Sequence, residues 1–171
     1  MSKIGLYIGN SSFMEDDEED YFVNIHYNDL RNFYTLDADL FDVIVIDNCL
    51  QKIENFYAII DNTKRVLKNG GEFIIILPDY RLYEKCIWPS KFNSKHINSF
   101  SLNLNRDIVK RESHWHIENN LIPFVKNFGF DDFEHFLDDN NYDYDKPVLV
   151  DQTKDGASCF IMLKSILKTK E

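Results

Sequence analysis

Four side chains that can exchange a proton lie in one short stretch of this chain, residues 79–96: Asp79, Tyr83, Glu84 and His96. Among these residue types, only histidine ordinarily changes its charge near neutral pH. His96 is therefore the best candidate for a general base, with Glu84 and Tyr83 as further catalytic candidates. The alternative is that this stretch is only an ordered flap, in which His96 bonds to a backbone carbonyl.

The same stretch carries three large aromatic side chains, Tyr83, Trp88 and Phe92. Large apolar rings are costly to expose on a flexible loop, so we expect the stretch to fold back onto the molecule. The rings would then form an apolar wall beside a small-molecule site, with His96 pointing into it.

The segment just before this stretch, residues 41–79, predicts a strand, a crossover helix and a second strand. Val43 to Ile46 and Phe73 to Leu77 are continuous apolar runs, which is typical of parallel strands covered on both faces. Between them, apolar residues recur at helical spacing, and Gly70 and Gly71 follow basic residues as at the end of a helix. The segment is therefore a βαβ unit of a parallel α/β sheet.

Two further strands are predicted near the N-terminus, at Lys3 to Gly9 and Tyr21 to His26. Too few residues separate them for a long helix, so the first crossover is reduced to a loop or a single turn. A doubly wound sheet requires the Lys3 strand to lie beside both the Tyr21 strand and the Phe41 strand.

The C-terminal part predicts a helix and two strands. Asn119 or Asn120 can cap a helix that continues to Phe128 and ends at Gly129. The two strands, predicted to be antiparallel edge strands, are residues 130–137 and 157–167.

A ligand in an open α/β sheet lies outside the carboxyl ends of the strands, where the strand order reverses. A glycine at the first strand end, Gly9, lets the backbone approach a ligand closely, although a simple turn would also use glycine. The sequence thus nominates one set of binding residues, all at predicted strand ends: Gly9, Asn10, Ser11, His26, Asp29, Asp47 and Asn48.

Composition narrows the class of protein. The 171 residues fit one domain, and the net charge of −10 disfavours a nucleic-acid partner, which requires a concentrated basic patch. Three cysteines without paired spacing predict free thiols in a reducing compartment. With no long apolar run and no secretory segment, we expect a cytoplasmic protein without a membrane partner.

Two clusters of potential metal ligands do not predict a metal site. His114 and His116 are an i, i+2 pair without a third ligand at a recognisable spacing. The acidic run from Glu15 to Asp20 lacks the ligand alternation and central glycine of a calcium loop. We expect no metal.

The run FDVIVIDNCLQKI…RVLKNGGEFIIILPD, from Phe41 to Asp79, resembles the second half of class I S-adenosylmethionine-dependent methyltransferases. LYIGNS followed by YFVNIH is similar to the start of short members of this family. The post-strand stretch, of the form P-D-x-x-L-Y-E…W-P-S-x-F-N-x-x-H, resembles a subset of them. The resemblance implies a three-layer Rossmann-like α/β sandwich, with a mostly parallel seven-stranded sheet and an antiparallel C-terminal strand.

Three cofactor-side features depart from the family pattern. The usual G-x-G is Gly9-Asn10-Ser11, and the usual H-V-L-E-H after the FDVI strand is residues 48–52, NCLQK. The acid that binds both ribose hydroxyls is replaced by His26, and a neutral imidazole has only one acceptor. Asp29 could restore that contact.

Two functions follow from the resemblance. One is an S-adenosylmethionine-dependent methyltransferase that acts on a small molecule or a glycan. The other is a methyltransferase-like binding or structural subunit without catalysis, for which a homodimer is one arrangement. The altered strand ends favour the subunit, whereas the intact 83–96 stretch favours the enzyme.

Overall fold

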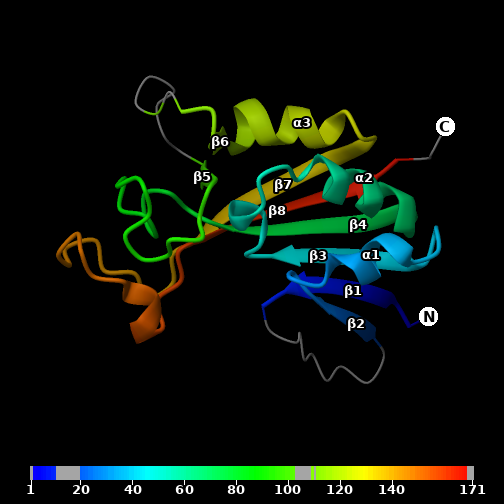
Figure 1. Ribbon diagram of the computed structural model, residues 1–171, viewed down its shortest axis with the longest axis horizontal. Helices are drawn as coiled ribbons and strands as arrows, with labels where there is room; N and C mark the ends of the chain where they lie inside the picture. The colour runs from blue at the N-terminus through cyan, green and yellow to red at the C-terminus, as the bar shows by residue number, and fades with distance from the viewer. Residues whose placement is uncertain (1, 11–19, 103–108, 110, 169–171) are drawn as a thin grey trace.

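A computed structural model describes residues 2–10, 20–102, 109 and 111–168. In this part of the chain, six strands form one sheet in the order β2-β1-β3-β4-β8-β7 (Figure 1). The strands β1 (Ile4–Gly9), β2 (Tyr21–His26), β3 (Phe41–Asp47) and β4 (Leu67–Pro78) run parallel. The C-terminal strand β8 (Phe160–Leu167) is antiparallel to both β4 and β7 (Phe130–Asp138).

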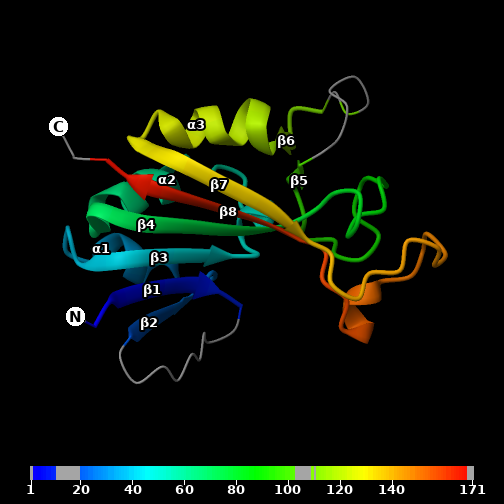
Figure 2. The ribbon, with the colours of Figure 1, turned by 180° about the vertical axis from the view of Figure 1, so that it is seen from behind.

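This architecture confirms the predicted fold class, a mostly parallel α/β sheet with an antiparallel C-terminal strand. The third layer that the resemblance implied is not seen among the described residues, whose helices lie on one face of the sheet (Figures 1 and 2). The sheet also confirms the order at the switch point, because β1 pairs with β2 on one side and with β3 on the other. The chain reverses its direction of winding at β1, so the carboxyl ends of β1, β2, β3 and β4 meet at one edge.

Three helices cover one face of the sheet: α1 (Leu30–Thr35), α2 (Tyr57–Val66) and α3 (Ile122–Lys126). Figures 1 and 2 show them on the same side of the strands, in front in one view and behind in the other. The connections from β2 to β3 and from β3 to β4 step in the same direction, so right-handed crossovers place α1 and α2 on the same face.

The main core lies between this face and the helices. Its fully buried side chains come from strands and helices alike, among them Ile44, Phe73, Phe33, Ile60 and Val125. Successive side chains of β3 point to opposite faces of the sheet, so residues 44 and 46 reach this core while Val43 and Val45 point away from it.

No helix among the described residues covers the opposite face. A smaller cluster there contains Tyr7, Val43 and Val45, against which Phe22 packs. Towards the amino ends of the strands this face is polar. There Glu72 forms ion pairs with Lys164 of β8 and with Lys3, just before β1. The helix-free face is thus apolar mainly near the carboxyl ends.

Several predicted boundaries differ from the structure. The described sheet has six strands where the resemblance implied seven. The helix α1 was not predicted. A single π turn, η2 (Ile117–Leu121), leads into α3, so the helical region begins before Asn119 and Asn120. Pro123 is tolerated because it lies at the start of α3, where a backbone N–H has no helical partner.

Gly70 and Gly71 were predicted to lie just after the end of the crossover helix, and the structure places this glycine pair within β4. It does not separate α2 from the next strand, because β4 begins at Leu67, directly after the helix. The pairing with β3 shifts register between Leu67 and Glu72, and Gly70 adopts a φ of +77° within this irregular part of β4.

The two predicted C-terminal strands are antiparallel, as expected, but only β7 is an edge strand. The last strand begins at Phe160, not at Ala157, and lies between β4 and β7. Burial explains this position, because alternate residues of β8 from Ile161 to Leu167 are buried on the helix-covered face.

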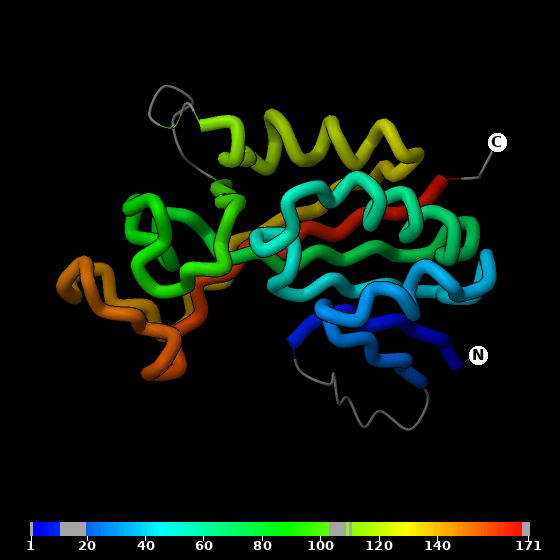
Figure 3. The backbone as a smooth tube through the Cα atoms, viewed as in Figure 1, coloured from blue at the N-terminus to red at the C-terminus, as the bar shows by residue number. Residues whose placement is uncertain are grey.

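Two long irregular segments project beyond the carboxyl edge, residues 79–98 and residues 139–156 (Figure 3). The second contains a short 3-10 helix, η3 (Gln152–Asp155). A further 3-10 turn, η1 (Leu50–Lys52), follows β3. The strands β5 (Ser99–Ser101) and β6 (His114–His116) form a separate parallel pair beside the first segment.

The structure also bears on the state of the cysteines and on the length of the helices. All three cysteines are free, as predicted. Within the described ranges, no helix is both long enough and apolar enough to cross a membrane.

Candidate functional site

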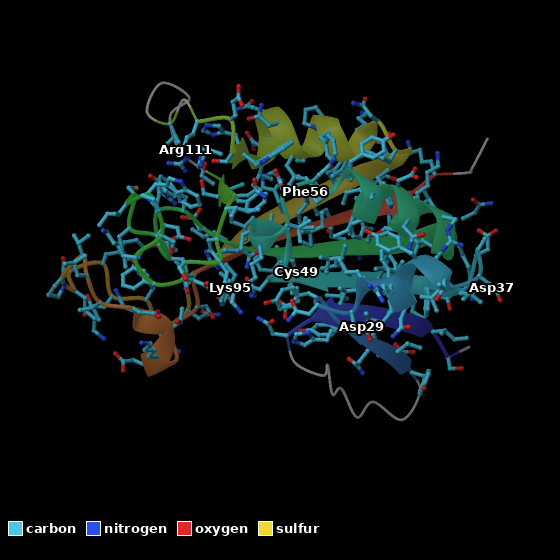
Figure 4. The ribbon with its side chains drawn as sticks, in the orientation of Figure 1. Asp29, Asp37, Cys49, Phe56, Lys95 and Arg111 are labelled. Carbon is cyan, nitrogen blue, oxygen red and sulfur yellow. The ribbon has the colours of Figure 1, made fainter. Side chains whose placement is uncertain are left out.

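A cavity of about 170 Å³ lies at the carboxyl edge of the sheet, which we call the strand-end pocket. Its lining comes from the ends of β1, β3 and β4, from η1 and η3, and from the 79–98 segment. Figure 4 labels Cys49, just after β3, and Lys95, on that segment. The lining residues are Asn10, Asn48, Gln51, Lys52, Pro78, Tyr83, Asn93, His96, Thr153 and Phe160.

One lining residue, His96, forms a carboxylate–imidazole pair with Glu84, which does not itself line the pocket. Glu84 Oε1 lies 2.5 Å from His96 Nδ1, and both side chains are buried. An ionised carboxylate can only accept, so Nδ1 carries the proton and donates it to Glu84. The lone pair of His96 then lies on Nε2, on a ring that lines the pocket. The geometry matches that of a general base oriented by an acid.

The aromatic residues divide between two places. The ring of Tyr83 lies against His96, with centroids 5.2 Å apart, and Phe92 packs edge-on against Tyr83 with centroids 6.0 Å apart. Trp88, in contrast, does not line the pocket and stacks on Arg111. The predicted apolar wall therefore consists of Tyr83 supported by Phe92, with Phe160 from β8.

Tyr83 is suited to donating a hydrogen bond. Burial, followed by the nearby charges of Asp151 and Glu84, raises the pKa of Tyr83 to about 12. The phenol therefore keeps its proton near neutral pH and cannot act there as a base.

Asp79 is a structural residue rather than a lining residue. It is fully buried, and its Oδ1 accepts hydrogen bonds from the backbone N–H groups of Arg81 and Leu82. These bonds hold the turn by which the chain leaves β4. Burial is also the largest cause of the raised pKa of the Asp79 carboxyl.

The glycine at the end of β1 does not leave open space. A Cβ on Gly9 would lie 2.6 Å from the Tyr7 hydroxyl oxygen, because the Tyr7 ring covers this position. The Tyr7 hydroxyl donates to Asp47 Oδ2 at 2.5 Å, and Asn48 Nδ2 donates to Asp47 Oδ1 at 2.7 Å. The chain's own side chains therefore occupy the approach to Gly9 and both oxygens of Asp47.

The residues at the end of β2 mainly bond locally. His26 is exposed, and its Nδ1 accepts from the backbone N–H of Asn28. Asp29 Oδ2 accepts from Asn32 Nδ2 in the first turn of α1, so it does not replace the missing acid. Neither His26 nor Asp29 lines the strand-end pocket, whereas Asn10 and Asn48 do. Ser11 lies outside the described residues.

Four polar lining residues were not predicted as site residues: Gln51, Lys52, Asn93 and Thr153. In the sequence, Gln51 stands out only as part of a departure from a family motif. Gln51 is 2% exposed, and its Oε1 has no hydrogen-bond partner among the described residues. A buried acceptor in this state favours a ligand that donates to it.

Lys52 supplies the positive charge of the pocket. It follows β3 in η1, and its ammonium lies 4.6 Å from the centre of the Tyr27 ring, just beyond β2. The only sequence signal for this residue was its place after a strand end, since a lysine in a turn is ordinarily solvated.

Comparison with known proteins identifies the fold. Residues 11–75 match the family model described as a methyltransferase domain. No curated protein matches the chain. A S-adenosylmethionine-dependent methyltransferase from Thermotoga maritima aligns with a TM-score of 0.58 at 14% identity, over 98% of this chain and 84% of that chain.

Two archaeal structures agree with this result. A methyltransferase of the same kind from Archaeoglobus fulgidus aligns with a TM-score of 0.56 at 10% identity, over 96% of this chain and 86% of that one. Another from Methanosarcina mazei aligns with a TM-score of 0.54 at 14% identity, over 99% of this chain and 94% of that one. The resemblance to class I S-adenosylmethionine-dependent methyltransferases is confirmed, and at these identities the structural likeness concerns the fold.

Proposed function

We propose that this chain is an S-adenosylmethionine-dependent methyltransferase that acts on a small molecule or a glycan. The observation that carries the proposal is the buried Glu84–His96 pair, whose histidine lines a pocket at the carboxyl edge of a methyltransferase-type sheet. A base at this place has a use in methyl transfer when the acceptor is a hydroxyl group or a protonated amine.

The polar lining of the pocket suits the amino-acid end of the cofactor. Lys52 can pair with a carboxylate, and the oxygen of Gln51 can accept from an ammonium group, with Asn10 and Asn48 beside them. About 170 Å³ is below the range of roughly 300 Å³ and more that is usual for whole drug-sized ligands. The pocket therefore fits one end of the cofactor, not the entire molecule.

When bound, the cofactor supplies a methyl group on a positively charged sulfur. The chain supplies alignment and a proton acceptor. Glu84 holds the imidazole of His96 in one orientation and one tautomer, so that Nε2 can take the proton of an acceptor hydroxyl. Tyr83 fixes the ring from one side, which limits the loss of alignment.

The substrate class rests on the remaining lining and on the charge. Tyr83 and Phe160 offer apolar surface, while Asn93 and Thr153 offer hydrogen bonds, a mixture that suits a compact polar molecule or a sugar. A net charge of −10 disfavours a polyanionic acceptor.

The direct test is calorimetric titration with S-adenosylmethionine and S-adenosylhomocysteine, followed by a turnover assay on His96→Ala. If His96 is the base, turnover falls by roughly 10² to 10⁴ while cofactor affinity changes little. His135→Ala is the matched control, because His135 lies on β7 and pairs with Glu118 outside the pocket. A loss of melting temperature without a selective loss of turnover would make His96 structural.

A second candidate is a methyltransferase-fold binding or structural subunit without catalysis. The Tyr7 ring over Gly9 favours it, because that ring takes the space that a close ligand needs. The absence of an acid at the end of β2 favours it as well. Failure of both cofactor forms to bind at millimolar concentration would support this candidate over the enzyme.

The proposal also covers the cellular location, the domain content and the oligomeric state of the protein. Three free cysteines support a cytoplasmic location, since thiols persist in reducing compartments. We propose that residues 1–171 act as one domain and that a homodimer is the form to test first, by light scattering.

A further inference from the structure

A second and larger cavity, of about 430 Å³, lies beside the β5–β6 pair. Arg111, His114 and His116 line it together with the exposed side chains of Glu112, Asn119 and Asn120. None of these six residues lines the strand-end pocket. Figure 4 places Arg111 next to β5 and β6, away from the β1–β2 side of the sheet.

The guanidinium of Arg111 is held in place by neutral groups. Its central carbon lies 4.3 Å from the ring centre of Trp88 and 5.3 Å from that of Tyr80. One of its terminal nitrogens, Nη2, donates to Ser99 Oγ at 2.6 Å. Stacking on two rings and one hydrogen bond orient the plane of the group before any ligand arrives.

The charge of Arg111 is not neutralised within the described part of the chain. No carboxylate there forms an ion pair with it, although acids outnumber bases by 29 to 19 in the sequence. In addition, Arg111 Nε is buried and has no hydrogen-bond partner among the residues that the structure describes. An oriented guanidinium with an unused donor is the group that proteins use to bind carboxylates and phosphates in a bidentate manner.

The neighbouring histidine supports this arrangement without adding charge. His114 is buried between Ser99 and Ser101, whose hydroxyls lie 2.7 Å from Nδ1 and 2.9 Å from Nε2. Burial lowers the pKa of His114 to about 4, so its ring is neutral near pH 7, with one ring nitrogen accepting and the other donating. His114 thus fixes Ser99, which in turn holds Arg111. Besides His116, the described residues of the cavity wall that carry a formal charge are Arg111 and Glu112.

We infer that this cavity is a binding site for an oxyanion, a phosphate or carboxylate group, with Arg111 as its principal ligand. The carboxamides of Asn119 and Asn120 can provide further donors at the rim. Glu112 opposes such a ligand, which gives the inference a second consequence: removal of this negative charge should strengthen binding.

Titration of the full chain with inorganic phosphate, and separately with acetate, tests the site by NMR chemical shifts of the two tryptophan indoles. Trp88, which stacks on Arg111, should respond, whereas Trp115, which packs on Phe56, should not. Arg111→Gln should weaken binding by about tenfold or more, and Glu112→Gln should tighten it severalfold. Arg31→Gln, which removes an exposed arginine of α1, should change nothing.

A response to phosphate alone or to acetate alone assigns the ligand class, and either supports the site if Arg111→Gln abolishes it. Equal binding by the native protein and Arg111→Gln would overturn the inference, as would no response to either anion at about 20 millimolar. If Arg111→Gln does not fold, Arg111→Lys replaces it, because a lysine keeps the charge but cannot bind in a bidentate manner. Native affinity in that variant would also overturn the inference.

Discussion

Acidification should destabilise this protein through His114. Burial, followed by the charges of His116 and Arg111, lowers the pKa of His114 to about 4 in the folded chain, from an ordinary value of 6.5. Between these two values the unfolded chain binds a proton at this site and the folded chain does not. The free energy of unfolding therefore falls as the pH falls through this window, and it is fully retained above the ordinary value.

The size of the effect follows from the two pKa values. Between pH 7 and pH 4.5 the proton linkage at this single site removes about 2 kcal/mol, or a little more, of the free energy of unfolding. The structural reason is burial, because the His114 ring is buried between Ser99 and Ser101, where its charged form is poorly solvated. The added charge would also lie near the guanidinium of Arg111.

Urea unfolding at pH 7 and pH 4.5 measures this contribution, with His114→Gln as the comparison. All other titrating groups are shared, so the difference between the two proteins in their pH dependence isolates His114. We expect the native protein to lose about 2 kcal/mol more than the variant on acidification. Equal losses, or a larger loss in the variant, would refute the reasoning.

Three further predictions concern single positions. Gly9→Ala should lower the free energy of unfolding by about 1 to 3 kcal/mol in urea unfolding, since the new methyl group would displace the Tyr7 ring; an unchanged midpoint would contradict the described packing. His26→Asp should tighten S-adenosylmethionine by about tenfold in calorimetry by providing two acceptors for the ribose, and an unchanged affinity would count against a ribose contact at this strand end. Gly70→Ala should cost about 1 kcal/mol because the φ of +77° strains any residue with a Cβ, whereas a neutral result would show that this part of β4 can relax.

The amino-acid sequence alone determined the main elements and the edge at which a ligand would bind. Continuous apolar runs such as Val43 to Ile46 predict buried parallel strands, because few other elements hide both faces of a short segment. Parallel strands connected by right-handed crossovers then leave little choice of order around β1. The edge that carries Asn10, Asn48 and Pro78 follows from that order.

Only the tertiary structure decided which side chains meet at that edge. Glu84 and His96 are separated by twelve positions of irregular chain, and no periodicity predicts that their side chains approach within 2.5 Å. The Tyr7 ring over Gly9 depends on the alternation of β1 and on an acceptor at the end of β3, residues that are distant in the sequence.

The second cavity shows the same division. His114 and His116 could be recognised as a pair on one face of a strand, since alternate residues of a strand point the same way. Their partners were not predictable, because Ser99, Ser101 and Arg111 reach them through the pairing of β5 with β6 and the stacking of Trp88. Local patterns determine which segments are buried and how they repeat, whereas contacts between irregular segments depend on how the whole chain packs.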